Sequence, residues 1–254
     1  MVQERGLKDL TCEYDINAKL YYDSALKKNA SHAYSYFKRA LSLYAEENLP
    51  AAILDFNKTI SLDPTNADAY NFRGDTKIRL KDTLGGIRDF DTSIIIEPNN
   101  YSYYTDRGEA YYDLDSNRLA LKDYTYAYKL DSTKYRAPFF MGLIYYYSEK
   151  FDIANALFKK CTKIDSTAPG PYFYRAKIMY NIDNYDIALD EINNAIRLFS
   201  DNASYYVTRA KIYMFNESEY DDDMAIEDLN KAIKMGSEEA KDLLGEYFSE
   251  GDAE

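Results

Sequence analysis

The sequence is poor in the residues on which catalytic, metal-binding and disulfide-rich proteins depend. It has no tryptophan, one histidine (His32) and two cysteines (Cys12 and Cys161) among 254 residues. Two cysteines do not make a disulfide framework, and no metal-ligand spacing surrounds the histidine. We therefore expect no catalytic residues, no metal site and no cofactor. His32 is expected in a solvated turn, and Cys161 as a small buried residue.

Long apolar runs and an excess of positive charge are also missing. No stretch of 18 apolar residues is present, so we expect no membrane span. Residues 1–10 carry charges where a signal peptide needs an apolar core. The cytoplasm is thus the default location, although a removed signal would leave the same sequence. The net charge of −12 argues against nucleic acid as a partner. Glycine (10) and proline (6) are scarce, which favours helices.

A pattern that returns every 34 residues organises the chain. Counted from residues 33, 67, 101, 135, 169 and 203, small residues occupy three positions of each repeat. Position 8 is Ala40, Gly74, Gly108, Gly142, Ala176 and Ala210. Position 20 is Ala52, Gly86, Ala120, Ala154, Ala188 and, after a three-residue insertion, Ala225. Position 27 is Thr59, Ser93, Ala127, Cys161, Ala195 and Ala232. Small residues at fixed places indicate helices that pack closely in every repeat.

Each repeat is typical of two antiparallel helices, at about positions 2–14 and 18–31, joined by a short polar turn. Bulky residues occupy complementary positions, where they fill the space that the small residues leave. Position 4 is Tyr36, Tyr70, Tyr104, Tyr172 and Tyr206. Position 24 is Phe56, Phe90, Tyr124, Phe158, Ile192 and Leu229. The repeats end in segments such as SLDPTN, whose polar residues offer N-caps to the following helix.

With these residues at these positions of a 34-residue repeat, the chain resembles the tetratricopeptide repeat family. The resemblance covers nearly the whole chain, although tyrosine replaces the family's tryptophan and Pro138 occupies position 4 of one repeat. It implies an all-α, right-handed α–α superhelical solenoid with a C-terminal capping helix, forming one domain over residues 1–254. The expected repeats 1 to 7 are 1–32, 33–66, 67–100, 101–134, 135–168, 169–202 and 203–236, followed by a capping helix at 237–250 and a tail at 251–254.

A pair of opposite charges travels with the repeat. Position 7 is Arg39, Arg73, Arg107, Met141, Arg175 and Arg209. Position 23, on the other helix, is Asp55, Asp89, Asp123, Leu157, Glu191 and Asp228. Where the arginine becomes Met141, the acid becomes Leu157. This covariation predicts an ion pair inside each repeat that is replaced as a pair in repeat 5.

The resemblance also implies that the first helices line a concave groove, with positions 2, 5, 9, 12 and 13 directed into it. An acidic middle section is followed by an aromatic and basic one. The candidate peptide-binding residues are Tyr34, Phe37, Tyr44, Asn71, Asp75, Glu109, Tyr112, Arg136, Phe139, Tyr146, Phe173, Lys177, Tyr180 and Lys211. The alternative interpretation is that several of these aromatic side chains pack against neighbouring repeats. No position 5 is lysine, so the carboxylate clamp of chaperone-binding family members is absent.

The sequence thus favours a non-catalytic scaffold that binds a peptide segment of another protein. One alternative is an assembly module that uses its ends or convex face, including homo-oligomerisation through the uncapped repeat 1. A second is a carbohydrate or small-ligand binder that uses the groove tyrosines. A third is the regulatory region of a larger enzyme.

Overall fold

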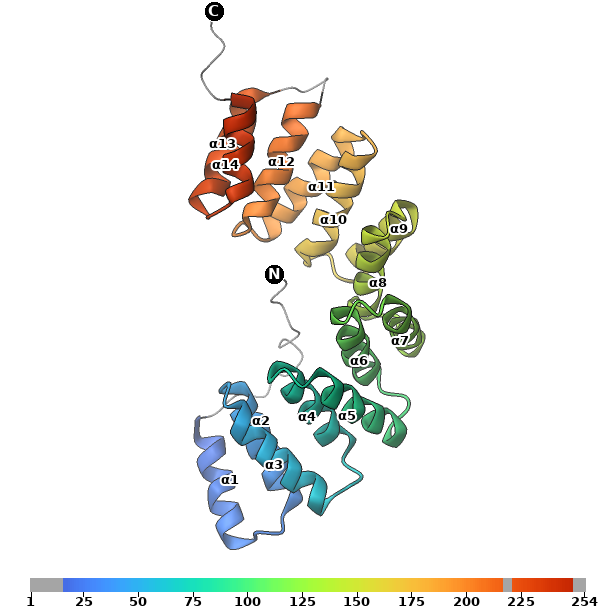
Figure 1. Ribbon diagram of the computed structural model, residues 1–254, viewed down its shortest axis with the longest axis vertical. Coiled ribbons are helices and arrows are strands. Elements are labelled where there is room, and N and C mark those ends of the chain that lie inside the picture. The colour runs from blue at the N-terminus through green and yellow to red at the C-terminus, as the bar shows by residue number, and fades with distance from the viewer. Residues whose placement is uncertain (1–15, 217–220, 249–254) are drawn as a thin grey trace, which may run out of the picture. The chain divides into compact units, whose positions relative to one another are not determined.

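The computed structural model describes residues 16–216 and 221–248, and every helix or strand assigned in these residues is an α-helix (Figure 1). The chain divides into two compact units, which we call the first unit (Met1–Leu130) and the second unit (Asp131–Glu254). The first unit contains α1 (Ile16–Lys28), α2 (Ala33–Ala45), α3 (Leu49–Leu62), α4 (Ala67–Arg79), α5 (Thr83–Ile96), α6 (Tyr101–Asp113) and α7 (Asn117–Leu130). The second unit contains α8 (Arg136–Tyr147), α9 (Phe151–Ile164), α10 (Pro169–Asn181), α11 (Tyr185–Leu198), α12 (Ala203–Phe215), α13 (Asp222–Lys234) and α14 (Glu238–Phe248).

The helices follow the predicted period, and the all-α expectation is confirmed. Each repeat from 2 to 7 contributes a first helix and a second helix that pack against each other, from α2 with α3 to α12 with α13. The second helix of repeat 1 is α1, and the segment where its first helix is expected lies outside the described residues. The helix α14 follows the last repeat, where a capping helix is expected, and the tail at 251–254 also lies outside. That both units continue one solenoid stays a prediction.

The turn inside each repeat is shaped by one residue in the left-handed region. Position 15 has a positive φ in five successive repeats although none of these residues is glycine. They are Glu47, Lys81, Asp115, Glu149 and Asp183, with φ between 53° and 72°. A left-handed residue stops an α-helix and lets the following backbone N–H reach back to its last turn. Asn48 N, for example, donates to Leu43 O at 2.8 Å. A two-helix hairpin therefore recurs with the same geometry.

The small residues at positions 8 and 20 bring the two helices of a repeat together. A Cβ added to Gly86 would lie 2.6 Å from the backbone oxygen of Gly74. In the next repeat, a Cβ on Gly108 would lie 2.9 Å from the Tyr124 ring. Backbones approach this closely only where side chains are minimal, and the bulky residue at position 24 fills the remaining space. The predicted complementarity of small and large positions is confirmed.

Polar residues begin many of the helices, as the repeat ends predict. Asn66 and Asn202 accept backbone N–H bonds at the starts of α4 and α12. Asp221 accepts from Met224 N at 3.0 Å and so caps α13. Before α14, Gly236 has a φ of 89° and Ser237 Oγ accepts from Ala240 N at 3.2 Å. These side chains satisfy backbone donors that a helix leaves unpaired at its start.

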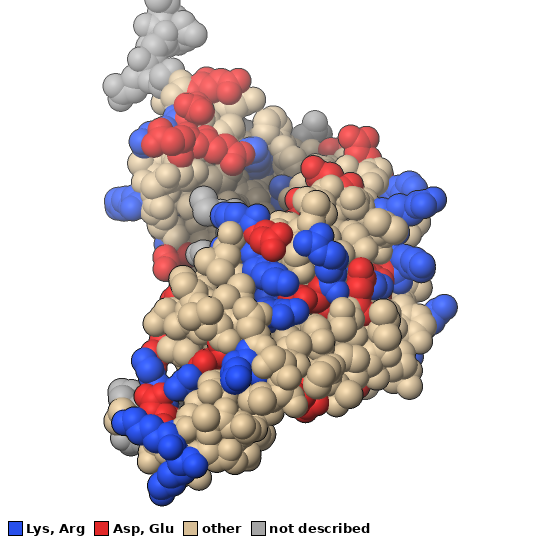
Figure 2. All heavy atoms as spheres, turned by 60° about the horizontal axis from the view of Figure 1, so that its bottom comes forward, with Lys and Arg blue, Asp and Glu red and all other residues tan. Residues whose placement is uncertain are grey.

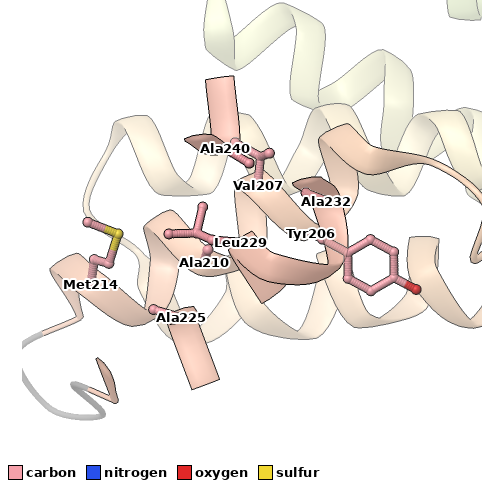
Figure 3. Close-up of a cluster of buried hydrophobic side chains, with 8 residues drawn as sticks. All are labelled: Tyr206, Val207, Ala210, Met214, Ala225, Leu229, Ala232 and Ala240. Atoms are coloured by element: carbon pink, nitrogen blue, oxygen red, sulfur yellow. The ribbon is translucent and has the colours of Figure 1, made fainter. Parts of the chain in front are cut away.

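The last repeat and α14 share one apolar core (Figure 3). Leu229 from α13 and Ala210 from α12 are fully buried at its centre. Ala240, the single buried residue of α14, closes the cluster. The remaining surface of α14 is polar or partly exposed, so this helix covers the apolar side of the last repeat as a capping helix must.

The predicted ion pairs are present in all five repeats that carry the arginine. Two or more nitrogens of Arg39, Arg73, Arg107 and Arg209 bond both oxygens of the aspartate at position 23. In repeat 6, Arg175 Nη1 lies 2.6 Å from Glu191 Oε1. All five carboxylates are buried, so each pair holds its two helices in one register while it neutralises buried charge.

Candidate protein-binding face

The first helices form the inner side of each unit. Among the packed helix pairs, α2 meets α4 and α4 meets α6 in the first unit, and α10 meets α12 in the second. Within each unit, the second helices of successive repeats are not among the packed pairs. A stack whose first helices approach more closely than its second helices curves towards the first helices. We call the side lined by positions 2, 5, 9, 12 and 13 the first-helix face.

In the first unit, tyrosine hydroxyls and carboxylates connect successive repeats along this face. Tyr44 Oη donates to Asp75 Oδ2 at 2.5 Å, and Tyr103 Oη donates to Asp68 Oδ1 at 2.7 Å. Burial and then the charge of Asp75 raise the pKa of Tyr44 above its usual range. The hydroxyl therefore stays protonated as a donor at neutral pH. Much of the polar surface predicted for binding is thus engaged between repeats.

Asn71 takes part in the same hydrogen bonding between repeats. Its Nδ2 donates to Asp106 Oδ2 at 2.8 Å, and the residue is only 7% exposed. Glu109 and Tyr112, from the following first helix, are partly exposed. The accessible part of the first-unit face is therefore acidic, and it includes the partly exposed Asp75 and the exposed Asp68.

In the second unit, a lysine lies between two aromatic rings. Lys177 Nζ is 5.5 Å from the ring centroids of both Tyr146 and Phe173. No carboxylate among the described residues pairs with this ammonium. Cation–π contacts hold a charge in place without neutralising it. Lys177 is partly exposed, so the face keeps an uncompensated positive charge beside aromatic surface.

More aromatic rings continue along the second-unit face. Phe173 contacts Tyr205 with ring centroids 4.8 Å apart, and Tyr180 contacts Phe215 at 6.3 Å. Lys211 differs from Lys177, because its Nζ forms an ion pair with Glu239 Oε1 at 2.7 Å. This part of the face combines apolar ring surface with one lysine already paired and one that is not.

The structure separates the candidate residues by burial. Phe37 is 8% exposed and packs against Phe56 and Phe72, so it belongs to the core. Tyr146 and Asn71 are also buried, whereas Tyr34 is 56% exposed. The other candidates are partly exposed: Tyr44, Asp75, Glu109, Tyr112, Arg136, Phe139, Phe173, Lys177, Tyr180 and Lys211. The Phe139 ring packs against the rings of Phe158 and Tyr174.

Several residues outside the candidate set also shape this face. Tyr103 and Tyr205, both at position 3, bond or stack across to the preceding repeat. The recurrence of tyrosine at position 3 is visible in the sequence and could have indicated these contacts. Arg79 and Phe215 share position 13, and the Arg79 guanidinium lies 4.8 Å from the Tyr44 ring centroid. Position 13 is predicted to face the groove, but the candidate peptide-binding residues do not include Arg79 and Phe215.

The described residues show no constellation for catalysis or metal binding. They contain no group of three or more metal-ligating side chains. His32 is the exposed N-cap residue that precedes α2, and its Nδ1 lies 2.7 Å from Ser35 Oγ. Cys161 is fully buried, as expected. On the face shown in Figure 2, positive and negative side chains are interspersed. No described helix has the length and apolar character needed to cross a membrane.

Comparison with known proteins places this arrangement in a fold class. No protein-family model matches the sequence, and no curated protein matches it. Solved structures do match. Pseudomonas aeruginosa PilF aligns with a TM-score of 0.76 at 16% identity, over 89% of this chain and 99% of PilF. A chain of the APC/C hetero-tetramer Cut9–Hcn1 aligns with a TM-score of 0.75 at 15% identity, over 92% of this chain. This chain spans about half, 46%, of that chain's length.

A third match is described as a tetratricopeptide repeat protein in its own right. YrrB, "a TPR protein with an unusual peptide-binding site", aligns with a TM-score of 0.58 at 21% identity. The alignment covers 72% of this chain and 95% of YrrB. The present chain has the fold of tetratricopeptide repeat proteins, an all-α helical-repeat solenoid.

Proposed function

We propose that this chain is a non-catalytic scaffold that binds a segment of another protein on its first-helix face. Its fold supports an interaction role, because stacked helical repeats offer extended surfaces rather than enclosed reaction sites. The likeness to YrrB, which has a peptide-binding site, supports the same interpretation. The described residues provide aromatic surface and charge on this face but no set of catalytic groups.

The observation that carries the proposal is the position of Lys177 between Tyr146 and Phe173. A partly exposed ammonium with no carboxylate partner attracts an acidic side chain or a backbone carbonyl. The partly exposed rings of Phe173 and Tyr180 provide apolar surface beside it. Aromatic anchors with a charge next to them are typical of peptide-binding surfaces, because the ring contributes burial and the charge sets orientation.

A binding experiment on the full chain tests this function. Purified protein serves as bait for a random 12-residue peptide display library, and selected peptides are titrated by fluorescence anisotropy. We expect Phe173→Ala together with Lys177→Gln to weaken binding at least about tenfold, as hot-spot losses do. Lys163→Gln, on the second helix α9, is the matched control and is expected to leave affinity unchanged. Selected peptides that bind the double variant as well as the native chain would reject the first-helix face.

A second candidate function is self-association through the N-terminal end. Leu20 and Tyr21 on α1 are 65% and 69% exposed, so they offer apolar surface to a second copy of the chain. Sedimentation velocity over a range of protein concentrations decides between the two. Concentration-dependent dimers that disappear in Leu20→Ser with Tyr21→Ser would favour assembly. A constant monomer would exclude self-association.

A further inference from the structure

The position 7 arginine does more than pair with its own repeat. Its third nitrogen, Nη1, reaches the residue 16 places earlier, which is position 25 of the preceding repeat. Arg107 Nη1 donates to Asp91 Oδ1 at 2.6 Å while its other two nitrogens hold Asp123. The same link joins Arg39 to Asp23 at 2.7 Å, Arg73 to Asn57 at 2.8 Å and Arg209 to Asn193 at 2.8 Å. One guanidinium therefore fixes two helices of one repeat and a helix of the repeat before it.

Repeat 6 keeps the link by a different bond. Its arginine, Arg175, has Lys159 at position 25 of the preceding repeat, and a cation cannot accept a hydrogen bond from a guanidinium. Arg175 Nε donates instead to Asn155 Oδ1 at 3.2 Å. Asn155 lies on the same preceding helix, one turn earlier. The connection between repeats is retained even where its usual acceptor is lost.

The tyrosine at position 4 belongs to the same cluster. The guanidinium of Arg107 lies 5.8 Å from the Tyr104 ring centroid, and the corresponding distance from Arg39 to Tyr36 is 5.5 Å. Equivalent contacts join Arg73 to Tyr70 and Arg209 to Tyr206. We call the arginine, its acid at position 23, its acceptor in the preceding repeat and, where present, this tyrosine the arginine brace.

Repeat 5 replaces every member of the brace. Pro138 stands for the tyrosine, Met141 for the arginine and Leu157 for the acid, and the preceding repeat has Thr125 at position 25. A methionine has no N–H group to donate, so no brace of this kind can form at this place. The first helix of repeat 5 lacks a side-chain cap, as do those of repeats 2 and 6. It begins at position 2, at Arg136, after Tyr135, which provides no side-chain cap.

The division of the chain coincides with this replacement. The two compact units separate between Leu130 and Asp131, which is the turn between α7 and α8. We propose that the lost brace makes the protein two cooperative units, repeats 1–4 and repeats 5–7, that unfold independently. In a repeat protein, opening spreads from one repeat to the next only through the coupling free energy of their interface. Where that coupling is lowest, one side opens while the other stays folded.

Hydrogen exchange of the full chain in increasing urea tests the proposal. We expect amides in α2–α7 to lose protection at one urea concentration and amides in α8–α13 at another. The two midpoints should differ by at least about 0.5 M, which corresponds to about 1 kcal/mol for a small cooperative unit. A single midpoint shared by all described helices would overturn the proposal.

Two reciprocal variants show whether the brace sets the boundary. Thr125→Asp with Met141→Arg and Leu157→Asp places charged residues at the same positions of the sequence repeat as the brace of repeat 4. We expect the two midpoints to merge. Asp91→Thr with Arg107→Met and Asp123→Leu moves the gap to repeat 4, and we expect α6 and α7 to lose protection separately from α2–α5.

The second variant keeps the test decisive if the first does not fold, since it carries the substitutions that repeat 5 already tolerates. An unchanged exchange pattern in the variant with Asp91→Thr, Arg107→Met and Asp123→Leu would contradict the role of the brace. Met141→Leu is the matched control, because it changes an apolar residue at the same site without adding a donor. It is expected to leave the two midpoints as they are.

Discussion

Arg107 and Asp123 form a bidentate ion pair. Nε and Nη2 of the arginine lie 2.8 and 2.7 Å from the two carboxylate oxygens. The Asp123 side chain is 4% exposed and that of Arg107 is 18% exposed. Replacement of Arg107 alone leaves a buried carboxylate without its principal donor. We expect Arg107→Met to lower the free energy of opening of α6–α7 by about 3 kcal/mol.

Addition of Asp123→Leu to that variant should recover a large part of the loss, because the unpaired charge is then gone. Native-state hydrogen exchange of the two single variants and the double variant gives the coupling energy. The exposed pair Lys241–Glu238 is the control, with an expected coupling of about 0.5 kcal/mol or less. Equal losses in the single and double Arg107 variants would refute the pair's contribution.

Gly86 is expected to tolerate no side chain. An added Cβ would lie 2.6 Å from Gly74 O and 2.5 Å from the Ile78 side chain, so α4 and α5 would have to move apart. Gly86→Ala should destabilise this repeat by about 2 kcal/mol in urea unfolding, the range for overpacked cores. Gly245→Ala in α14 is the matched control, because nothing lies within 4 Å of its added Cβ. Gly245→Ala should stabilise its helix by up to about 1 kcal/mol. A Gly86→Ala variant as stable as the native chain would disprove the close packing.

Cys161 is expected to be chemically protected while repeat 5 is folded. Burial raises the pKa of its thiol to about 12, so roughly one molecule in ten thousand carries the reactive thiolate at pH 8. In a Cys12→Ser background, Ellman's reagent should label Cys161 slowly in buffer and within seconds in denaturing urea. A cysteine at the exposed residue Ser132, with Cys161→Ser, provides the fast reference. Equal rates for the two thiols in buffer would show that Cys161 is accessible.

The tyrosines predict instability in alkali. Burial is the first cause that raises the pKa of Tyr44, Tyr103, Tyr104, Tyr111, Tyr146 and Tyr180. The unfolded chain has a tyrosine pKa of about 10, so the folded state favours the neutral hydroxyl. The resulting stability is complete below pH 10 and is lost as the pH rises above 10 through the folded-state values.

Circular dichroism from pH 8 to 12, recorded with absorbance at 295 nm, measures this loss. Unfolding and the late tyrosine ionisations should occur together. Tyr103→Phe should make the pH dependence shallower, whereas Tyr34→Phe, at a ring that is 56% exposed, serves as the control. A fold that stays intact after all tyrosines have ionised would contradict the expectation.

Local features of the fold were readable from the sequence because each repeat satisfies the same packing rule. Closely packed helices are predicted by the size and spacing of two residue pairs alone, Gly74 with Gly86 and Gly108 with Tyr124. The pairs of Arg107 with Asp123 and of Met141 with Leu157 change together, since a buried charge requires its counterion. The candidate site was less readable, because Phe37 and Tyr34 are both aromatic, lie on one helix and differ entirely in exposure.

The sequence by itself determined the helical hairpin, its period and the ion pair within each repeat, since these depend on residues at fixed separations along one chain segment. Tertiary structure decided which aromatic rings remain at the surface, because Phe37 is buried only by what α3 and α4 bring against it. It also decided where the third nitrogen of each arginine points. That bond depends on the orientation of the preceding repeat, and its acceptors, Asp91 and Asn57 among them, have no common charge.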